Sequence, residues 1–149
     1  MSLRHGLEIR AATAAEAPGL AILLAEAGLL IEARDLAERI TALRQGSATA
    51  LVALQWGPPS GLVLMHWYPT LAAASPVAQI TCLLVGEEQR RMGIGRLLLK
   101  GAAQAARVAG CTRMEIAAAA ESPSLQAFCR ATGFVEAGPG FSRSLRKQG

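Results

Sequence analysis

The clearest pattern of hydrophobic positions lies in the middle of the chain, where an apolar run is followed by a charged loop and an amphipathic segment. Residues 80–85 are mostly apolar, which predicts a central β-strand. After the loop, apolar residues recur at the spacing of an α-helix that ends near Gly110. The face that we expect to point inward holds Ile94, Leu97, Leu98, Gly101, Ala105 and Val108.

The rest of the chain divides into short segments of the same two kinds. Alternating or apolar runs predict strands at 7–10, 49–54, 61–67, 114–120, 134–136 and 141–145. Helices are expected between Thr13 and Gly28, at about 32–44 and at 124–132. The order β-α-α-β-β-β-α-β-α-β-β predicts an α/β (α+β) fold with a mixed sheet, in a single domain spanning residues 1–149.

Two pairs of side chains support the first two helices. Thr13 and Glu16 have the spacing of a capping box at the start of the first helix. Asp35 and Arg39 are four residues apart on the second helix, so we expect an ion pair on its outer side.

Composition and charge narrow the class of protein. Hydrophobic residues make up 52% of the 149 residues and charged ones 17%, which predicts a folded domain with a proper core. Aromatic residues are only 4%, so the stacking platforms of single-stranded nucleic-acid binding are scarce. The net charge of +4 fits either ordinary solubility or attraction to a small polyanion.

The cysteines and the apolar segments suggest a location. Cys82, Cys111 and Cys129 form no CxxC or Cys/His pair, so we expect neither a zinc site nor a disulfide framework, and no metal. The N-terminus lacks the pattern of a signal peptide, and the apolar run 20–31 is too short to span a bilayer. We therefore expect a reduced, cytoplasmic protein that binds no membrane.

The charged loop has the features of an anion site. Gly93 and Gly95 leave backbone amides uncovered, and the helix that follows begins with unpaired N–H groups. Arg90, Arg91 and Arg96 surround this point, which favours a phosphate or pyrophosphate. A Walker loop would need Lys-Ser/Thr after Gly95. A dinucleotide fingerprint would need a third glycine at the position of Leu98, and it would lie in the first βα unit rather than in the middle of the chain. Neither is present.

The loop matches a third pattern. The stretch from Arg90 through Gly93 to Gly95 reads R-x-x-G-x-G after a strand ending in Leu-Val, and it resembles motif A of the GNAT superfamily of N-acetyltransferases. Downstream, Phe128 and the pair Gly133-Phe134 resemble the motif B of that family. The expected order of elements also matches the GNAT fold.

The resemblance implies acetyl-CoA, or another acyl-CoA, as the co-substrate. Its pyrophosphate would bind the amides of about 91–96, and its pantetheine arm would pair with the central strand, which in this family splays from the next one. Ser122 stands where relatives often have an asparagine near the coenzyme, although the residue also fits a helix N-cap. The implied coenzyme-binding residues are Leu83, Leu84, Val85, Arg90, Arg91, Met92, Gly93, Ile94, Gly95, Arg96, Ser122 and Phe128.

The catalytic residues follow the family less closely. Many relatives have a tyrosine in motif B that protonates the leaving thiolate, and here that position is Cys129. The thiol could donate a proton through water, or it could simply pack as a small apolar group. Candidate bases for the amine are His66, Glu115 and Glu121.

The resemblance also implies where the acceptor binds. In this fold the acceptor pocket is walled by the connector between the first two helices and by the closing hairpin. The implied residues are Leu29, Leu30, Ile31, Glu32, Tyr68 and Phe141. The connector could instead be tucked under the core, and Tyr68 could be structural.

Three functions are compatible with the sequence. The first is transfer of an acetyl group to a primary amine of a small molecule or peptide, with no nucleic acid as partner; homodimers are common in the family, which leaves a homodimer open. The second is an acyl-CoA-binding regulatory domain with weak or lost catalysis, suggested by Cys129 and by a central strand without carboxylates. The third, nucleic-acid binding, would need a basic face away from the glycine loop.

Overall fold

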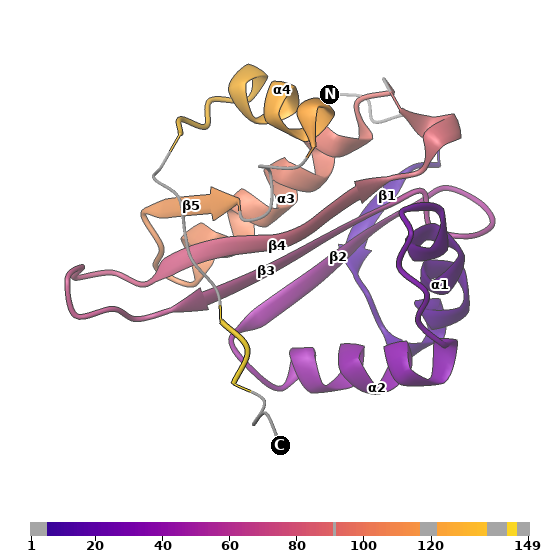
Figure 1. Cartoon of the computed structure of the whole chain (residues 1–149), viewed down its shortest axis with the longest axis horizontal. Coiled ribbons are helices and arrows are strands. Elements are labelled where there is room, and N and C mark those ends of the chain that lie inside the picture. The colour runs from indigo at the N-terminus through magenta and orange to yellow at the C-terminus, as the bar shows by residue number, and fades with distance from the viewer. Residues whose placement is uncertain (1–5, 91, 117–121, 137–142, 146–149) are drawn as a thin grey trace. The chain divides into compact units, whose positions relative to one another are not determined.

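The computed structural model in Figure 1 describes residues 6–90, 92–116, 122–136 and 143–145. The chain forms two compact units, Met1–Ala118 and Ala119–Gly149. The first unit holds a β-sheet with helices on both faces, and the second unit holds one described helix.

The sheet of the first unit has five strands among the described residues. They are β1 (Glu8–Ala11), β2 (Ala48–Leu54), β3 (Gly61–Tyr68), β4 (Val77–Val85) and β5 (Arg113–Ile116). Their order across the sheet is the same as along the chain. Neighbours from β1 to β4 are antiparallel, whereas β4 and β5 are parallel and are joined by a helical crossover.

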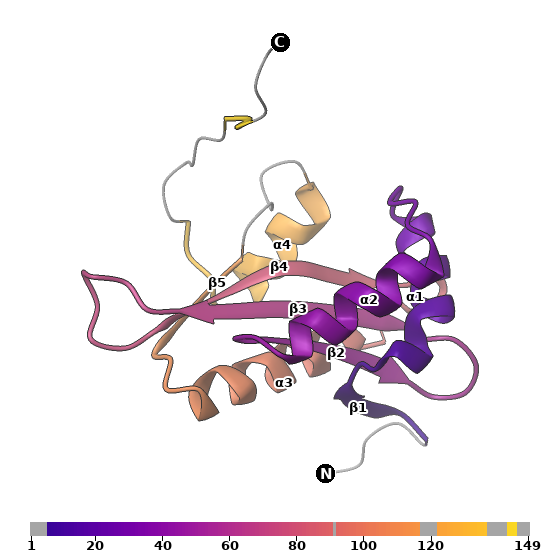
Figure 2. The same cartoon turned by 90° about the horizontal axis from the view of Figure 1, so that it is seen from below.

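Helices cover both faces of this sheet (Figures 1 and 2). The helices α1 (Ala17–Glu26) and α2 (Ala33–Arg44) bury Leu20, Leu36 and Ile40 with residues of β2 and β3 on one face. The crossover helix α3 (Ile94–Val108) covers the other face. The strands are therefore buried on both sides, which explains why their sequences are apolar with little alternation.

The start of α1 confirms the predicted capping box. Thr13 caps a short 3₁₀ turn, Ala14–Glu16, and its side chain accepts a hydrogen bond from the amide of Ala15. The Glu16 carboxylate accepts the Thr13 amide at 2.7 Å and pairs with Arg10 of β1 at 3.0 Å. This ion pair and hydrogen bond hold the pKa of Glu16 below its ordinary value, and they fasten the helix entry to the sheet.

The inward face of α3 differs from the prediction at its end. The buried residues are Ile94, Leu98, Ala102 and Ala106. They form a ridge with i,i+4 spacing, and Val108, which lies off this ridge, is 80% exposed. The prediction that Val108 points inward is therefore wrong.

The second unit contains the predicted short helix, α4 (Pro123–Ala131). Ser122 caps it, and its most buried residue is Cys129, whereas Leu125 and Phe128 are half-buried. Gly133 (φ +94°) follows the C-cap residue Thr132, and the amide of Phe134 donates to the carbonyl of Cys129 at 2.9 Å.

The predicted closing strands are not found in the described residues. Neither 134–136 nor 143–145 forms a strand, and 137–142 lie outside the described residues. The amide of Phe134 closes the end of α4, so it is not available to a strand ladder. The strand expected at 114–120 is described only as Arg113–Ile116.

Two further findings concern the described residues as a whole. None of their helices has the length and apolar character needed to cross a bilayer. Cys82, Cys111 and Cys129 are all free thiols.

Candidate active site

The start of α3 presents uncovered backbone amides. Gly93 is the N-cap residue with φ +81°, a left-handed conformation that favours glycine. No side chain caps the helix, and the first intrahelical bond is donated by the amide of Leu97 to the carbonyl of Gly93 at 3.1 Å. The amides of Ile94, Gly95 and Arg96 therefore have no acceptor within the described residues.

The packing of α3 fixes these amides at the carboxyl end of β4. Ile94 and Leu98 are buried against Gly61 of β3, which pairs with Val85. A Cβ atom added at Gly61 would lie 2.8 Å from Leu98 Cδ1 and 3.0 Å from Ile94 Cγ2. Helix and strand approach so closely because Gly61 has no side chain, and this sets the position of the first turn.

Charged side chains of both signs lie in the loop before α3, where Glu87 and Glu88 form part of a 3₁₀ turn that ends at Arg90. A helix N-terminus normally attracts acidic residues, but the first turn of α3 has none and carries Arg96. Arg90 precedes it in the loop, and both arginines are exposed with no ion-pair partner among the described side chains. Met92 is also exposed, and Arg91 lies outside the described residues. The combination of free amides and free guanidinium groups is suited to an anion.

A β-bulge in β4 lies next to this site. Leu64 pairs with Cys82 and Met65 pairs with Ile80, so Thr81 is an extra residue in β4. The bulge reverses the alternation beyond it: Leu84 packs with the cluster under α1 and α2, whereas Leu83 and Val85 pack with the cluster under α3. The sequence analysis missed this bulge. The one signal in the sequence is the polar residue Thr81 within a mostly apolar strand, and Thr81 is exposed in the structure.

The pairing of β4 with β5 is short. The ladder runs from Val77–Arg113 to Ile80–Ile116 and goes no further in the described residues. Beyond it, Leu83, Leu84 and Val85 pair with β3 on one side, and their other edge has no described strand beside it. Such an edge offers backbone N–H and C=O groups to an extended ligand.

Three polar residues lie in one row across the sheet. His66 of β3 pairs with Gln79 of β4, and Gln79 pairs with Glu115 of β5. Their neighbours in each strand pack with the α3 cluster, so these three residues point to the face that carries α1 and α2. The row thus contains two of the candidate bases, His66 and Glu115, with Gln79 between them. Glu115 is one residue from the end of the β4–β5 ladder.

Gln79 is the centre of this row, and the sequence analysis missed it. The hydroxyl of Tyr68 donates to its Oε1 atom at 3.4 Å, and Glu115 pairs with Arg113 at 3.3 Å. The strand was expected to begin at residue 80, so Gln79 was not assigned to it, whereas β4 begins at Val77. The third candidate base, Glu121, lies outside the described residues.

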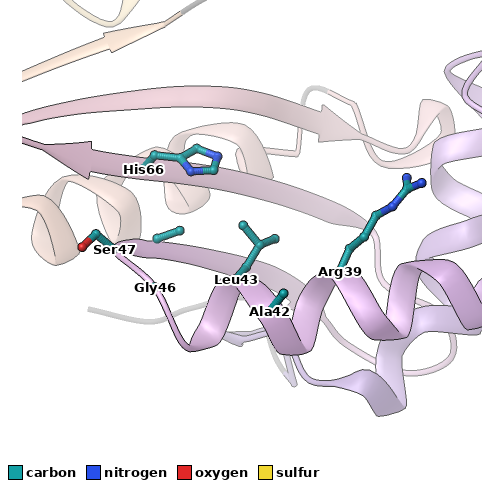
Figure 3. A pocket seen from close by; sticks show the side chains of 7 residues that line it. Arg39, Ala42, Leu43, Gly46, Ser47 and His66 are labelled. Atoms are coloured by element: carbon teal, nitrogen blue, oxygen red, sulfur yellow. The ribbon is translucent and has the colours of Figure 1, made fainter.

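At the other end of the row, His66 lines an open pocket of about 470 Å³ between α2, β2 and β3. The remaining lining residues are Arg39, Ala42, Leu43, Gly46, Ser47 and Ala48. Figure 3 shows the side chains of Arg39 and Leu43, which extend from α2, and that of His66, which extends from β3. The predicted Asp35–Arg39 ion pair is wrong, because Arg39 turns to this pocket and forms no ion pair among the described residues.

The connector between α1 and α2 divides into two parts. Leu29 and Leu30 are exposed, by 49% and 85%. Ile31 packs, as Leu84 does, against the buried cluster between α1, α2 and the sheet. For this residue the structure supports the alternative in which the connector is tucked under the core. Glu32 is the exposed N-cap residue of α2 without a side-chain capping bond, and Phe141 lies outside the described residues.

The candidate residues of the second unit are described within that unit alone. Ser122 Oγ accepts the amide of Leu125 at 3.3 Å, so it serves as a helix cap. Phe128 is half-buried and Cys129 is 9% exposed. Burial raises the pKa of the Cys129 thiol, and the nearby charge of Arg130 lowers it by less. Contact of Ser122 and Phe128 with the coenzyme stays a prediction.

The site thus combines a mixed sheet, a bulged fourth strand and a helix whose N-terminal amides are bare. The sequence model of the Acetyltransferase (GNAT) family matches residues 21–134, which is most of the chain. The protein therefore belongs to the GNAT acetyltransferase family. This confirms the resemblance seen in the glycine loop and in motif B. No curated protein matches the sequence.

Solved structures of acetyltransferases share the fold. A proposed acetyltransferase from Agrobacterium tumefaciens str. C58 is 27% identical with a TM-score of 0.80, covering 92% of this chain and 99% of that one. An aminoglycoside acetyltransferase from an uncultured soil metagenomic sample, in complex with sisomicin, is 20% identical with a TM-score of 0.78, covering 95% and 98%. Glucosamine-6-phosphate N-acetyltransferase from Arabidopsis thaliana is 13% identical with a TM-score of 0.81, covering 94% and 99%.

Proposed function

We propose that the protein transfers an acetyl group from acetyl-CoA to a primary amine of a small molecule or peptide. The observation that carries this proposal is the start of α3. Within the described residues, its first amides have no acceptor, Arg90 and Arg96 have no ion-pair partner, and the end of β4 has no strand on one side. The match to the GNAT family supports the same reaction class.

The residues fit the coenzyme in two places. The amides of Ile94, Gly95 and Arg96, with the guanidinium groups of Arg90 and Arg96, would hold the pyrophosphate. The edge of β4 at 83–85, which has no described strand beside it, would pair with the amides of the pantetheine arm. Acetyl-CoA would supply an acetyl group already activated as a thioester.

Glu115 is placed best to receive the proton of the amine. It lies beside the last pair of the β4–β5 ladder, on the face opposite α3, and its side chain is 38% exposed. The ion pair with Arg113 and the neighbouring Gln79 would hold its carboxylate in place. His66 is two strands from β5, about 10 Å, so its role would be to bind the acceptor.

The leaving thiolate of the coenzyme would take its proton from water. Cys129 is buried, and burial raises the pKa of its thiol, which makes it a weaker acid than an exposed cysteine. The burial supports packing as its role. Proximity of amine and thioester would then provide most of the rate enhancement.

The acceptor class is supported by the solved relatives and by the lining of the site. The names of two relatives specify an aminoglycoside and glucosamine-6-phosphate as substrates, and the complex contains sisomicin. Here the pocket at His66 has one arginine and no acid, which does not suit a polycation. We therefore propose an amine of low positive charge. The three free cysteines support a reducing compartment such as the cytoplasm as its location.

The coenzyme site is tested by calorimetry with acetyl-CoA. Arg96→Gln should weaken binding about tenfold, because a charge-assisted bond to the phosphate is lost. Arg107→Gln is the matched control, since it changes an exposed arginine in the last turn of the same helix. Equal affinities of the two variants would contradict the placement of the pyrophosphate.

Catalysis is tested by release of coenzyme thiol with a panel of primary amines. Glu115→Gln should lower kcat about 100-fold or more and leave the affinity for acetyl-CoA unchanged. If His66→Gln causes that loss and Glu115→Gln does not, the assignment of the base is wrong. Tight coenzyme binding without turnover of any amine would instead favour the regulatory domain.

A further inference from the structure

The outer side of α1 is apolar although it faces solvent. The inner side of this helix is buried with α2 and the sheet. From Ala14 to Leu30, every exposed residue is apolar or glycine except Glu26. A surface helix normally carries polar residues on the side opposite the core. The outer side of α1 is thus an apolar surface that the described residues leave uncovered, which is typical of an interaction site.

The exposed apolar residues form a stripe. Pro18, Ile22 and Ala25 follow one another at intervals of four and three residues, so they lie on one side of the helix. Ile22 is 58% exposed. The amide of Leu29 donates to the carbonyl of Leu24 at 2.9 Å, which folds the chain over the end of α1. The exposed side chains of residues 29 and 30 therefore extend the stripe into the connector.

The connector end of this α1 stripe is negatively charged. The last turn of α1 has no basic residue and carries Glu26, the reverse of what the helix dipole favours. Glu32 and Asp35 are exposed at the start of α2, and we call these three residues the acidic rim. None of them has an ion-pair partner among the described side chains. Arg34 is the one basic residue between Glu26 and Glu38.

This charge selects among the surfaces that could cover the stripe. The acidic rim would repel the phosphates of a nucleic acid or of an anionic bilayer. Size argues against a second copy of the chain, because the helical part of the stripe is about 12 Å long and about 10 Å wide. A stable dimer needs about 800 Å² from each partner. One helix face matches one helix of a partner instead.

We propose that the α1 stripe binds a cationic amphipathic helix of a partner protein. The apolar side of that helix lies on Ile22 and Leu29, and its lysine or arginine residues lie against the acidic rim. The contact belongs to the small, transient class of interfaces. It is independent of the proposed function, because α1 and α3 pack on opposite faces of the sheet.

The experiment uses two helical peptides of about 14 residues, with leucines at the same positions and either lysine or glutamate at the others. By calorimetry without acetyl-CoA, the lysine peptide should bind about tenfold tighter than the glutamate peptide, because only the lysine peptide complements the acidic rim. In NMR spectra, the amides that shift most on its addition should lie between Pro18 and Leu30.

Variants then locate the contact. Ile22→Ser and Leu30→Ser should each weaken the lysine peptide about tenfold, because apolar contact area is lost. Glu26→Gln should weaken it about twofold to threefold, as expected for one exposed ion pair. Val108→Ser is the matched control, since it removes an exposed apolar side chain on α3, and it should bind as the native protein does. Thermal unfolding checks that each exposed substitution leaves the fold intact.

Three results would overturn the proposal. The first is that the lysine peptide does not bind, or that the glutamate peptide binds equally well. The second is that Ile22→Ser and Leu30→Ser bind with native affinity, or that Val108→Ser loses as much as they do. The third is that the native protein self-associates and Ile22→Ser makes it monomeric, because a second copy would then cover the stripe.

Discussion

Replacing Gly93 with alanine tests the geometry of the coenzyme site at its most constrained point. Gly93 has φ +81° and ψ 6°, and an L-residue in this left-handed region costs about 1–2 kcal/mol. If the backbone keeps its conformation, the protein loses this stability. If the backbone relaxes, the first amides of α3 turn away from the phosphate.

The control variant is Gly110→Ala at the other end of α3. Gly110 has φ +90°, and a Cβ added there would meet no atom within 4 Å. It therefore imposes the same backbone strain far from the coenzyme. Each variant should lower Tm by about 2–8 °C in thermal unfolding, as expected for about 1–2 kcal/mol in a chain of this length.

The two variants should differ in calorimetry with acetyl-CoA. Gly93→Ala should weaken binding about tenfold or more, since misalignment of one amide removes a hydrogen bond to a charged group. Gly110→Ala should bind as the native protein does. If Gly93→Ala lost stability and still bound acetyl-CoA with native affinity, the amides at the start of α3 would not be the phosphate site.

Three further predictions concern the scaffold and the thiol. Gly61→Ala should destabilise the protein by about 1–3 kcal/mol in urea unfolding, because the new Cβ would lie 2.8 Å from Leu98 Cδ1; unchanged stability would contradict the close packing of α3 on β3. Glu16→Gln should cost about 1 kcal/mol at pH 7. Arg10 lowers the pKa of Glu16 in the folded protein. The difference in unfolding free energy between the native protein and Glu16→Gln should therefore persist above the ordinary carboxyl pKa of about 4.3 and fade as pH falls through the pKa of the folded state. A constant difference in urea unfolding at several pH values would refute this. Cys129→Ser should keep kcat within about threefold with an unchanged pH profile, because the raised pKa of the thiol makes it a poor acid. A larger fall in kcat without loss of fold would show that Cys129 protonates the leaving thiolate.

The half of the candidate site that we propose for the coenzyme could be predicted because it is local in sequence. The strand, the loop and the first turn of α3 are contiguous, and the conformations that they need are encoded by Gly93 and by the helical period after it. The capping box of Thr13 and Glu16 was predictable for the same reason. These features depend on residues only a few positions apart.

The row that we propose for the acceptor could not be predicted because it depends on strand register. His66, Gln79 and Glu115 become neighbours only when β3, β4 and β5 pair, and a shift of one residue would turn each to the other face. The bulge at Thr81 changes which residues of β4 face α3, and its location is a property of two strands. Arg39 was assigned to Asp35 because helical spacing predicts ion pairs but not the pocket that a neighbouring strand creates.

The most direct test of the central claim compares the binding of acetyl-CoA with that of S-acetylpantetheine, which lacks the pyrophosphate and the nucleotide. By calorimetry, Arg96→Gln should weaken the binding of acetyl-CoA about tenfold and leave that of S-acetylpantetheine unchanged, because the start of α3 contacts only the missing part. If the native protein binds both ligands equally, or if Arg96→Gln weakens both to the same extent, the start of α3 is not a pyrophosphate site and the account is wrong.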